Sequence, residues 1–120
     1  MENDRTAKLK IGGKEYTLIL TLKATKAISE RFGGLTKMGE ALTKATADNL
    51  GSVIWLIATL ANQSVLIYNF EHPESPEKEV TEELIELMMK PIDLAEAKEA
   101  IMECMIKGTK RDVESDAEKN

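Results

Sequence analysis

Few residues of this chain have side chains suited to covalent or acid–base catalysis. The sequence contains one cysteine, Cys104, and one histidine, His72. A nucleophile needs an acid–base partner held against it, but Cys104 falls in an apolar helical pattern and His72 precedes a proline-rich stretch. We therefore interpret Cys104 as a small buried thiol and His72 as a solvated imidazole, and not as a catalytic pair.

Carboxylates and glycines also lack the spacing of a known site. Glutamates recur along two predicted helices, at 82, 83 and 86 and at 96, 99 and 103, a pattern typical of solvated helix faces. The Gly12-Gly13-Lys14 sequence is too short for a phosphate-binding loop and falls between two strand patterns. We expect no enzyme activity, no cofactor and no metal site.

Composition narrows the classes of protein that remain. The chain has 120 residues, a net charge of −5, 31% charged and 42% hydrophobic residues, which is typical of one soluble globular domain. Basic residues are scattered and aromatic residues are few, so we expect no binding to nucleic acid. An N-terminus without an apolar signal region, together with a lone cysteine, indicates a reducing cytoplasm. We expect a single domain over residues 7–108, with disordered segments at 1–6 and 109–120.

The longest uncharged stretch runs through the middle of the chain. No Asp, Glu, Lys or Arg occurs between Asp48 and Glu71. A membrane span is disfavoured because Asn62, Gln63 and Ser64 would lie in the hydrocarbon region, where unpaired polar groups are costly. We therefore predict a central helix of a soluble domain over residues 48–70. The polar triplet either divides it into two helices or forms its wetter side.

Strand and helix signals surround this central run. Apolar residues alternate on both sides of Gly12-Gly13, which predicts a β-hairpin that needs a helix against its apolar face. Thr21 is the expected N-cap of a helix that ends at Phe32-Gly33, and a short helix is expected over residues 36–46. Asp48 is then expected to cap the central helix.

The second half of the chain contains two further helix patterns. A loop with two prolines leads to Thr81, the expected cap of a helix over residues 82–89. Pro91 separates it from a last helix, for which Asp93 and Glu96 suggest a capping box and Gly108 a C-terminal stop. The predicted fold is α+β and mainly α, with an N-terminal β-hairpin followed by four to five helices packed around the long central apolar helix.

The central helix is apolar on more than one face, so we expect it to be shared between the core and a partner. One face, with apolar residues three and four apart, is assigned to the core and consists of Leu50, Val53, Ile54, Ile57, Leu60, Ala61 and Val65. Methionines in the last two helices suit a surface that repacks around varied apolar partners, or alternatively fill gaps in the core. The candidate partner-binding residues are Trp55, Leu56, Leu66, Phe70, Met88, Met89, Met102 and Met105.

The order of these elements resembles the tail assembly chaperones of long-tailed phages and prophages, and the related tail proteins of gene transfer agents. The resemblance covers about residues 8–107. It depends on the hairpin turn at residues 11–16, on the helix that ends at Phe32-Gly33, and on the long uncharged helix containing Trp55. It also includes the TEELIELMM segment before the last helix.

The resemblance implies a protein of the bacterial host cytoplasm that binds the tape measure protein and keeps it soluble during tail assembly. It also implies recruitment of the tail tube protein, and the second face of the central helix could serve a homo-oligomer. Two alternatives stay open: a virion structural component, such as a tail tube or connector protein, and a small bacterial regulatory or antitoxin-type binding module. A tube subunit would need more strand than one hairpin.

Overall fold

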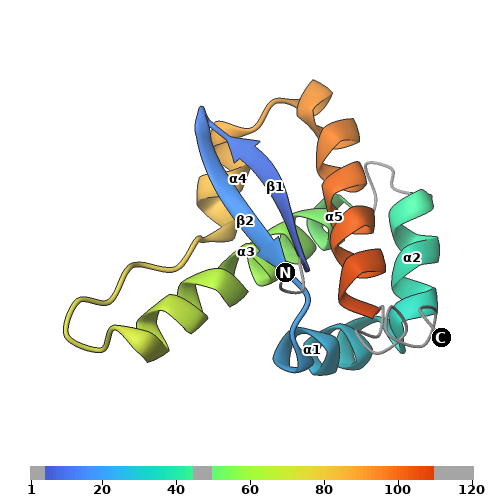
Figure 1. Cartoon of the computed structure of the whole chain (residues 1–120). Helices are drawn as coiled ribbons and strands as arrows, with labels where there is room; N and C mark the ends of the chain where they lie inside the picture. The colour runs from blue at the N-terminus through green and yellow to red at the C-terminus, as the bar shows by residue number, and fades with distance from the viewer. Residues whose placement is uncertain (1–4, 45–49, 110–120) are drawn as a thin grey trace, which may run out of the picture.

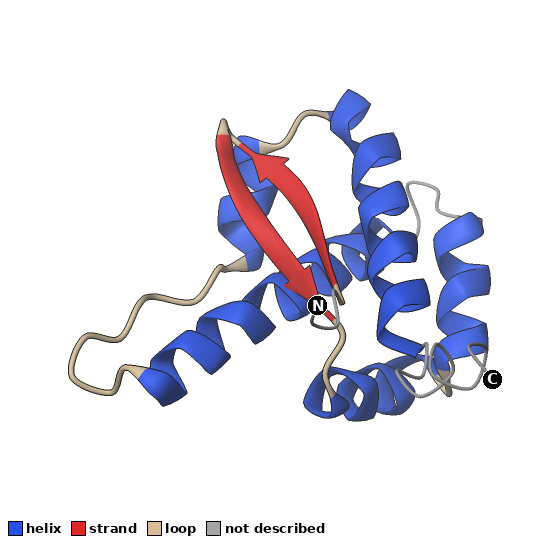
Figure 2. Cartoon of the chain, viewed as in Figure 1, coloured by secondary structure: helices blue, strands red, loops and turns tan. Residues whose placement is uncertain are grey.

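A two-stranded hairpin and a set of helices surround one long helix in the computed structural model, which describes residues 5–44 and 50–109 (Figures 1 and 2). The elements, in chain order, are β1 (Thr6–Ile11), β2 (Lys14–Ile19), α1 (Leu22–Phe32), α2 (Leu35–Thr43), α3 (Leu50–Glu71), α4 (Glu82–Met88), the 3-10 turn η2 (Pro91–Asp93) and α5 (Leu94–Thr109). The predicted α+β, mainly α fold is confirmed. α2 ends at Thr43 with Lys44 as its C-cap, earlier than the expected end at about residue 46. The Asp48 cap and most of the two expected disordered ends lie outside the described residues.

The hairpin forms because the glycine turn and the alternation of apolar residues in the two strands favour the same pairing. Gly12 and Gly13 have φ values of 62° and 87°, the left-handed conformation that a tight two-residue turn requires. Leu9 pairs with Tyr16 and Leu18 pairs with Ala7 on the same face of the hairpin, and the two leucines are buried at 2% and 0% exposure. β2 packs along α3 and β1 along α5, so these two helices cover the apolar face that two strands alone would leave in water.

The two short helices after the hairpin have defined ends. The Thr21 hydroxyl accepts a hydrogen bond from the Ala24 N–H (3.0 Å), and Gly33 ends α1 with φ 90° and an N–H bond to the Ser29 carbonyl. Both expected caps of α1 are confirmed. α2 begins at Leu35, one residue before the predicted start, and packs mainly against α1.

α3 is one uninterrupted helix of 22 residues, so the polar triplet does not divide it. The buried face differs from the predicted one in its rotation. Leu56 belongs to it, whereas Leu50, Ile54 and Val65 are only half-buried. The sequence pattern could not orient the face because apolar residues surround most of this helix, whose polar positions depend on partners elsewhere in the fold.

Three consecutive polar side chains in the middle of α3 bond to backbone or to another element. The buried Gln63 accepts a hydrogen bond from the Thr21 hydroxyl and donates to the Thr59 carbonyl (2.9 Å). Ser64 donates to the Thr17 carbonyl of β2 (3.2 Å). Among the described residues, α3 is the one helix long and apolar enough to span a bilayer by length and composition. Its central place in a compact fold is consistent with a soluble protein.

Two asparagines attach the chain that returns from the end of α3. The Asn62 amide donates to the Val80 carbonyl (2.8 Å) and accepts from the Val80 N–H, and Asn69 makes the same pair of bonds with Glu77 (3.0 and 2.7 Å). Positions 62 and 69 are about 10.5 Å apart along a helix, and positions 77 and 80 are about 10 Å apart in an extended chain. The two spacings match, so the returning segment runs antiparallel along α3.

The last two helices depart from prediction at two points. Thr81 caps α4 through the Leu84 N–H (3.1 Å), as expected. Asp93, however, accepts from the Lys90 N–H (2.8 Å) and closes η2, so its predicted role as the cap of α5 is wrong. The predicted stop at Gly108 is also wrong, because α5 continues to Thr109. A Cβ at Gly108 would lie 2.6 Å from the Leu20 Cβ, so this glycine serves close packing of α5 on the end of the hairpin.

We predict that Asn62→Ala lowers the free energy of unfolding by about 2 kcal/mol, because it leaves the N–H and carbonyl of the buried Val80 without partners. Asn69→Ala is the matched control: it breaks the same pair of bonds in an exposed place and should cost less than about 1 kcal/mol. Urea unfolding measures both costs, and hydrogen exchange should show faster exchange of the Val80 amide in the Asn62 variant. Equal costs at the two sites would contradict this account.

We also predict that Gly108→Ala destabilises the protein by about 1–3 kcal/mol although alanine favours helices, because the new methyl group overlaps Leu20. Gly51→Ala in the first turn of α3 is the control, since its Cβ would meet nothing within 4 Å. This control should be neutral or stabilising by up to about 1 kcal/mol. Urea midpoints of the two variants test the difference, and a stabilised Gly108 variant would disprove the packing role.

Candidate partner-binding surfaces

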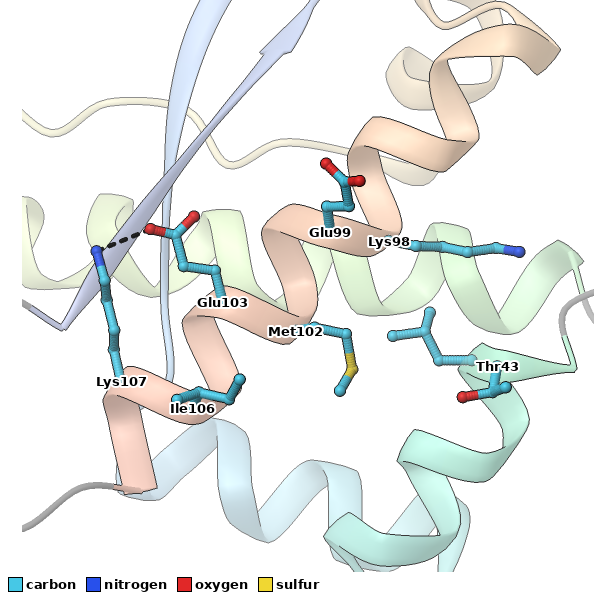
Figure 3. Close-up of a pocket in the computed structure, with 8 residues that line it drawn as sticks. Thr43, Lys98, Glu99, Met102, Glu103, Ile106 and Lys107 are labelled. Carbon is cyan, nitrogen blue, oxygen red and sulfur yellow. Dashed lines mark ion pairs between the residues drawn. The ribbon is translucent and has the colours of Figure 1, made fainter.

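An open groove of about 600 Å³ lies between α2 and α5 (Figure 3). Its lining consists of Leu42, Thr43, Lys98, Glu99, Met102, Glu103, Ile106 and Lys107. A second hollow of about 210 Å³ is lined by residues of the same two helices and also contains Met102 and Ile106. These two side chains therefore stand between two hollows, with exposures of 39% and 54%.

The apolar character of the groove follows from how α5 divides its side chains. Ala97, Ile101 and Cys104 are buried in the core, which leaves Met102 and Ile106 beside α2. The Lys107 ammonium lies 2.8 Å from the Glu103 carboxylate and also donates to the Thr6 carbonyl of β1 (3.1 Å). In Figure 3 this ion pair lies on the strand side of α5, while Met102 extends towards α2. The charges at this point thus neutralise each other outside the apolar part of the groove.

A separate hollow of about 370 Å³ lies where the start of α3 meets α4 and η2. It contains Met89 together with Leu50, Ile54 and Leu94, and its edge carries Glu86 and Lys90. Met89 is thus a further candidate methionine that lines a surface hollow. This hollow shares no lining residue with the α2–α5 groove, which contains Met102.

The eight candidate residues do not form one surface. Leu56 and Met105 are 1% and 7% exposed, so their assignment to a partner-binding surface is corrected: both are core residues. Phe70 is 89% exposed at the end of α3. Met88 is half exposed and lies against Gly12 of the hairpin turn, and Leu66 is half-buried beside α1.

Trp55 contacts the end of α1 and is half-buried there. Its ring lies edge-on to Phe32, with centroids 6.0 Å apart, and the Arg31 guanidinium lies 4.8 Å from its centroid. A cation over an aromatic face and an edge-to-face pair both stabilise the junction between two helices. Trp55 is therefore covered by residues of its own chain and is a packing residue first.

Sequence reasoning did not identify the α2–α5 groove as a site. Of its lining residues, Met102 alone was among the candidate partner-binding residues. The exposed Leu87 and Ile92 were also missed, at 74% and 80% exposure. No local pattern could reveal the groove, because its two walls come from helices about 60 residues apart in the chain.

Cys104 and His72, the two side chains first considered for catalysis, lie in separate parts of the fold. Cys104 is in α5, and His72 directly follows α3. Burial, reinforced by the neighbouring Glu103 carboxylate, raises the pKa of the Cys104 thiol to about 12, so it stays protonated and is a poor nucleophile. His72 stacks on Tyr68 at the end of α3, with ring centroids 4.1 Å apart. Within residues 5–44 and 50–109, no three potential metal-binding side chains cluster.

Comparison with known proteins adds no family, since no family model, curated protein or solved structure matches the chain significantly.

We predict that Trp55→Asp abolishes cooperative folding or lowers stability by at least about 3 kcal/mol, because it removes the ring and places a carboxylate at the α1–α3 junction. Trp55→Phe is the control and should cost less, since an aromatic ring remains. Circular dichroism during thermal unfolding distinguishes the two. A stable Trp55→Asp protein that had lost only its partner would instead place Trp55 on the binding face.

Proposed function

We propose that this protein is a tail assembly chaperone of a long-tailed phage or prophage, which binds the tape measure protein in the bacterial host cytoplasm and keeps it soluble. The observation that carries the proposal is the open apolar groove between α2 and α5. The choice of this family is based on the sequence resemblance. The groove supplies a physical means of binding, which the resemblance by itself lacks.

The groove has the apolar lining that an apolar helix of a client requires. Amphipathic helices bind by placing apolar side chains, spaced three or four residues apart, into a groove between helices. Met102 and Ile106 are themselves four residues apart and stand between two hollows, so they can interleave with such a row. A methionine in this position adapts to different client side chains, which suits a long client with many similar segments.

The rest of the body suits a soluble carrier. The chain has a net charge of −5, which favours solubility of a complex that contains apolar surface. The groove itself is bordered by charges of both signs, Lys98 and Glu99 at one end and the Glu103–Lys107 pair at the other. Charges of this kind at a rim orient a partner more than they add affinity.

A virion structural role, the first alternative, has less support. Tail tubes are built largely of sheet, whereas the described residues contain one two-stranded hairpin whose apolar face is already covered by α3 and α5. No surface feature of residues 5–44 and 50–109 favours the regulatory or antitoxin-type module.

The proposal predicts that co-expression raises the soluble fraction of the tape measure protein encoded beside this chain's gene, and that the two elute together on size exclusion. Ile106→Asp should weaken the complex at least about tenfold, because it places a charge between the two hollows. Leu87→Asp on α4 is the control, since Leu87 is more exposed and lies outside both hollows. Titration calorimetry or pull-down measures the difference.

Two results would contradict the proposal. The first is a tape measure protein whose solubility does not change and that forms no complex with the chain. The second is a complex that Ile106→Asp and Leu87→Asp affect equally, because the groove would then not be the binding site.

A further inference from the structure

A second surface runs along α3 on the side of α1. The groove between these helices has a volume of about 390 Å³ and is lined by Lys23, Lys26, Ala27, Glu30, Thr59, Asn62, Gln63, Leu66 and Glu79. Leu66 is its large aliphatic side chain. Phe70 follows one turn later on the same stripe of α3, beyond the end of the groove and 89% exposed.

The end of α3 projects from the body of the molecule, with the returning segment beside it (Figure 1). The Asn69–Glu77 bonds attach this segment to the helix, so the projection is a paired structure and not a frayed end. Phe70 is followed by two exposed carboxylates, Glu71 and Glu74. We call Phe70, Glu71 and Glu74 the acidic tip.

The basic side chains of the α1–α3 groove come from the first part of α1. Thr21 bonds to Gln63, whereas Arg31 lies over Trp55, so α1 and α3 run in opposite directions. Lys23 and Lys26 therefore lie at the end of the groove nearest Leu66, and Glu30 lies at the far end. Glu79 lines the groove from the returning segment, whose residue 80 is bonded to Asn62 of α3, so the lysine end of the groove contains two basic side chains and one acidic side chain. Both lysines are exposed, and no described carboxylate forms an ion pair with them.

We propose that two copies of this chain associate through an isologous interface, in which the acidic tip of each copy occupies the α1–α3 groove of the other. The register follows from the helix. If the two α3 ends cross in opposite directions with the two-fold axis beside Tyr68, Phe70 of one copy lies opposite Leu66 of the other. Glu71 then lies opposite residue 65 of the other copy, and Glu74 follows in the turn after α3, on the side where the partner copy presents Lys23 and Lys26.

The surface is complementary to itself in both chemistry and order. Each copy offers an exposed aromatic side chain followed by acidic residues, and each offers an aliphatic side chain followed by basic residues. No charged side chain lies on α3 before Glu71, so the two helices can approach closely without repulsion between their central parts. This interface uses α1 and the end of α3 and leaves the α2–α5 groove open, so it does not depend on the proposed function.

Sedimentation equilibrium of the purified chain over a range of concentrations tests the proposal. We expect a monomer–dimer equilibrium whose dissociation constant increases with salt, because ion pairs at its rim are screened. Phe70→Ala should raise the dissociation constant at least about 30-fold, as expected of a central aromatic anchor. Ile92→Ala on η2 is the matched control: Ile92 is 80% exposed but lies outside the interface, and its variant should dimerise normally. A chain that is monomeric at every concentration, or a dimer that Phe70→Ala does not weaken, would overturn the proposal.

Charge exchange tests the pairing itself. The Lys23→Glu/Lys26→Glu variant and the Glu71→Lys/Glu74→Lys variant should each dimerise at least about tenfold more weakly than the original chain, because like charges then face each other. An equimolar mixture of the two variants should recover dimers, since each tip then meets a groove of opposite charge. A mixture that associates no better than its components would overturn the assigned contacts. All of these positions are exposed, and circular dichroism should show unchanged helix content.

Discussion

The structure depends on the burial of one uncharged helix whose polar side chains all require partners. A helix as apolar as α3 gains stability from leaving water, but an amide or hydroxyl that goes with it costs free energy unless it is bonded. Gln63 bonds to Thr21, the N-cap of α1, and to the Thr59 carbonyl within α3. Ser64 bonds to β2, and Asn62 bonds to the returning segment. The same bonds hold these three elements in position. The burial of α3 therefore requires that these elements are assembled around it.

This arrangement also decides which surfaces remain open. α3 and α5 cover the hairpin, and the returning segment lies along α3, but α2 packs mainly on α1 and stands apart from α5. The space between α2 and α5 is bordered by Met102 and Ile106 instead of being closed by larger side chains. At its C-terminal end, α3 extends beyond the neighbouring helices, and Phe70 is exposed to solvent there. The two proposed binding surfaces are therefore places where the elements around the central helix leave one another uncovered.

Much of the fold could be predicted because its signals are local. Three kinds of signal act over only a few neighbouring residues: a Gly-Gly turn between alternating strands, a threonine before each of two helices, and a glycine pair after Phe32. Two predicted helix ends failed, one because of a distant contact and one because a different local partner was chosen. Gly108 was expected to end a helix, yet its role is to admit Leu20 from the other end of the chain. Asp93 was expected to cap the last helix, but its carboxylate turns back to Lys90.

The sequence by itself determined the secondary structure elements, the single-domain size and the central place of the uncharged run, because these follow from periodicity, capping and the cost of burying charge. The tertiary structure alone decided which face of that run is buried. Leu56 and Met105 were expected at a partner surface and are in the core, whereas Ile106 borders a groove. The physical reason is that a helix apolar on several faces has no preferred orientation of its own. Its rotation is set by Asn62, Gln63 and Ser64, whose partners are up to 47 residues away in the chain.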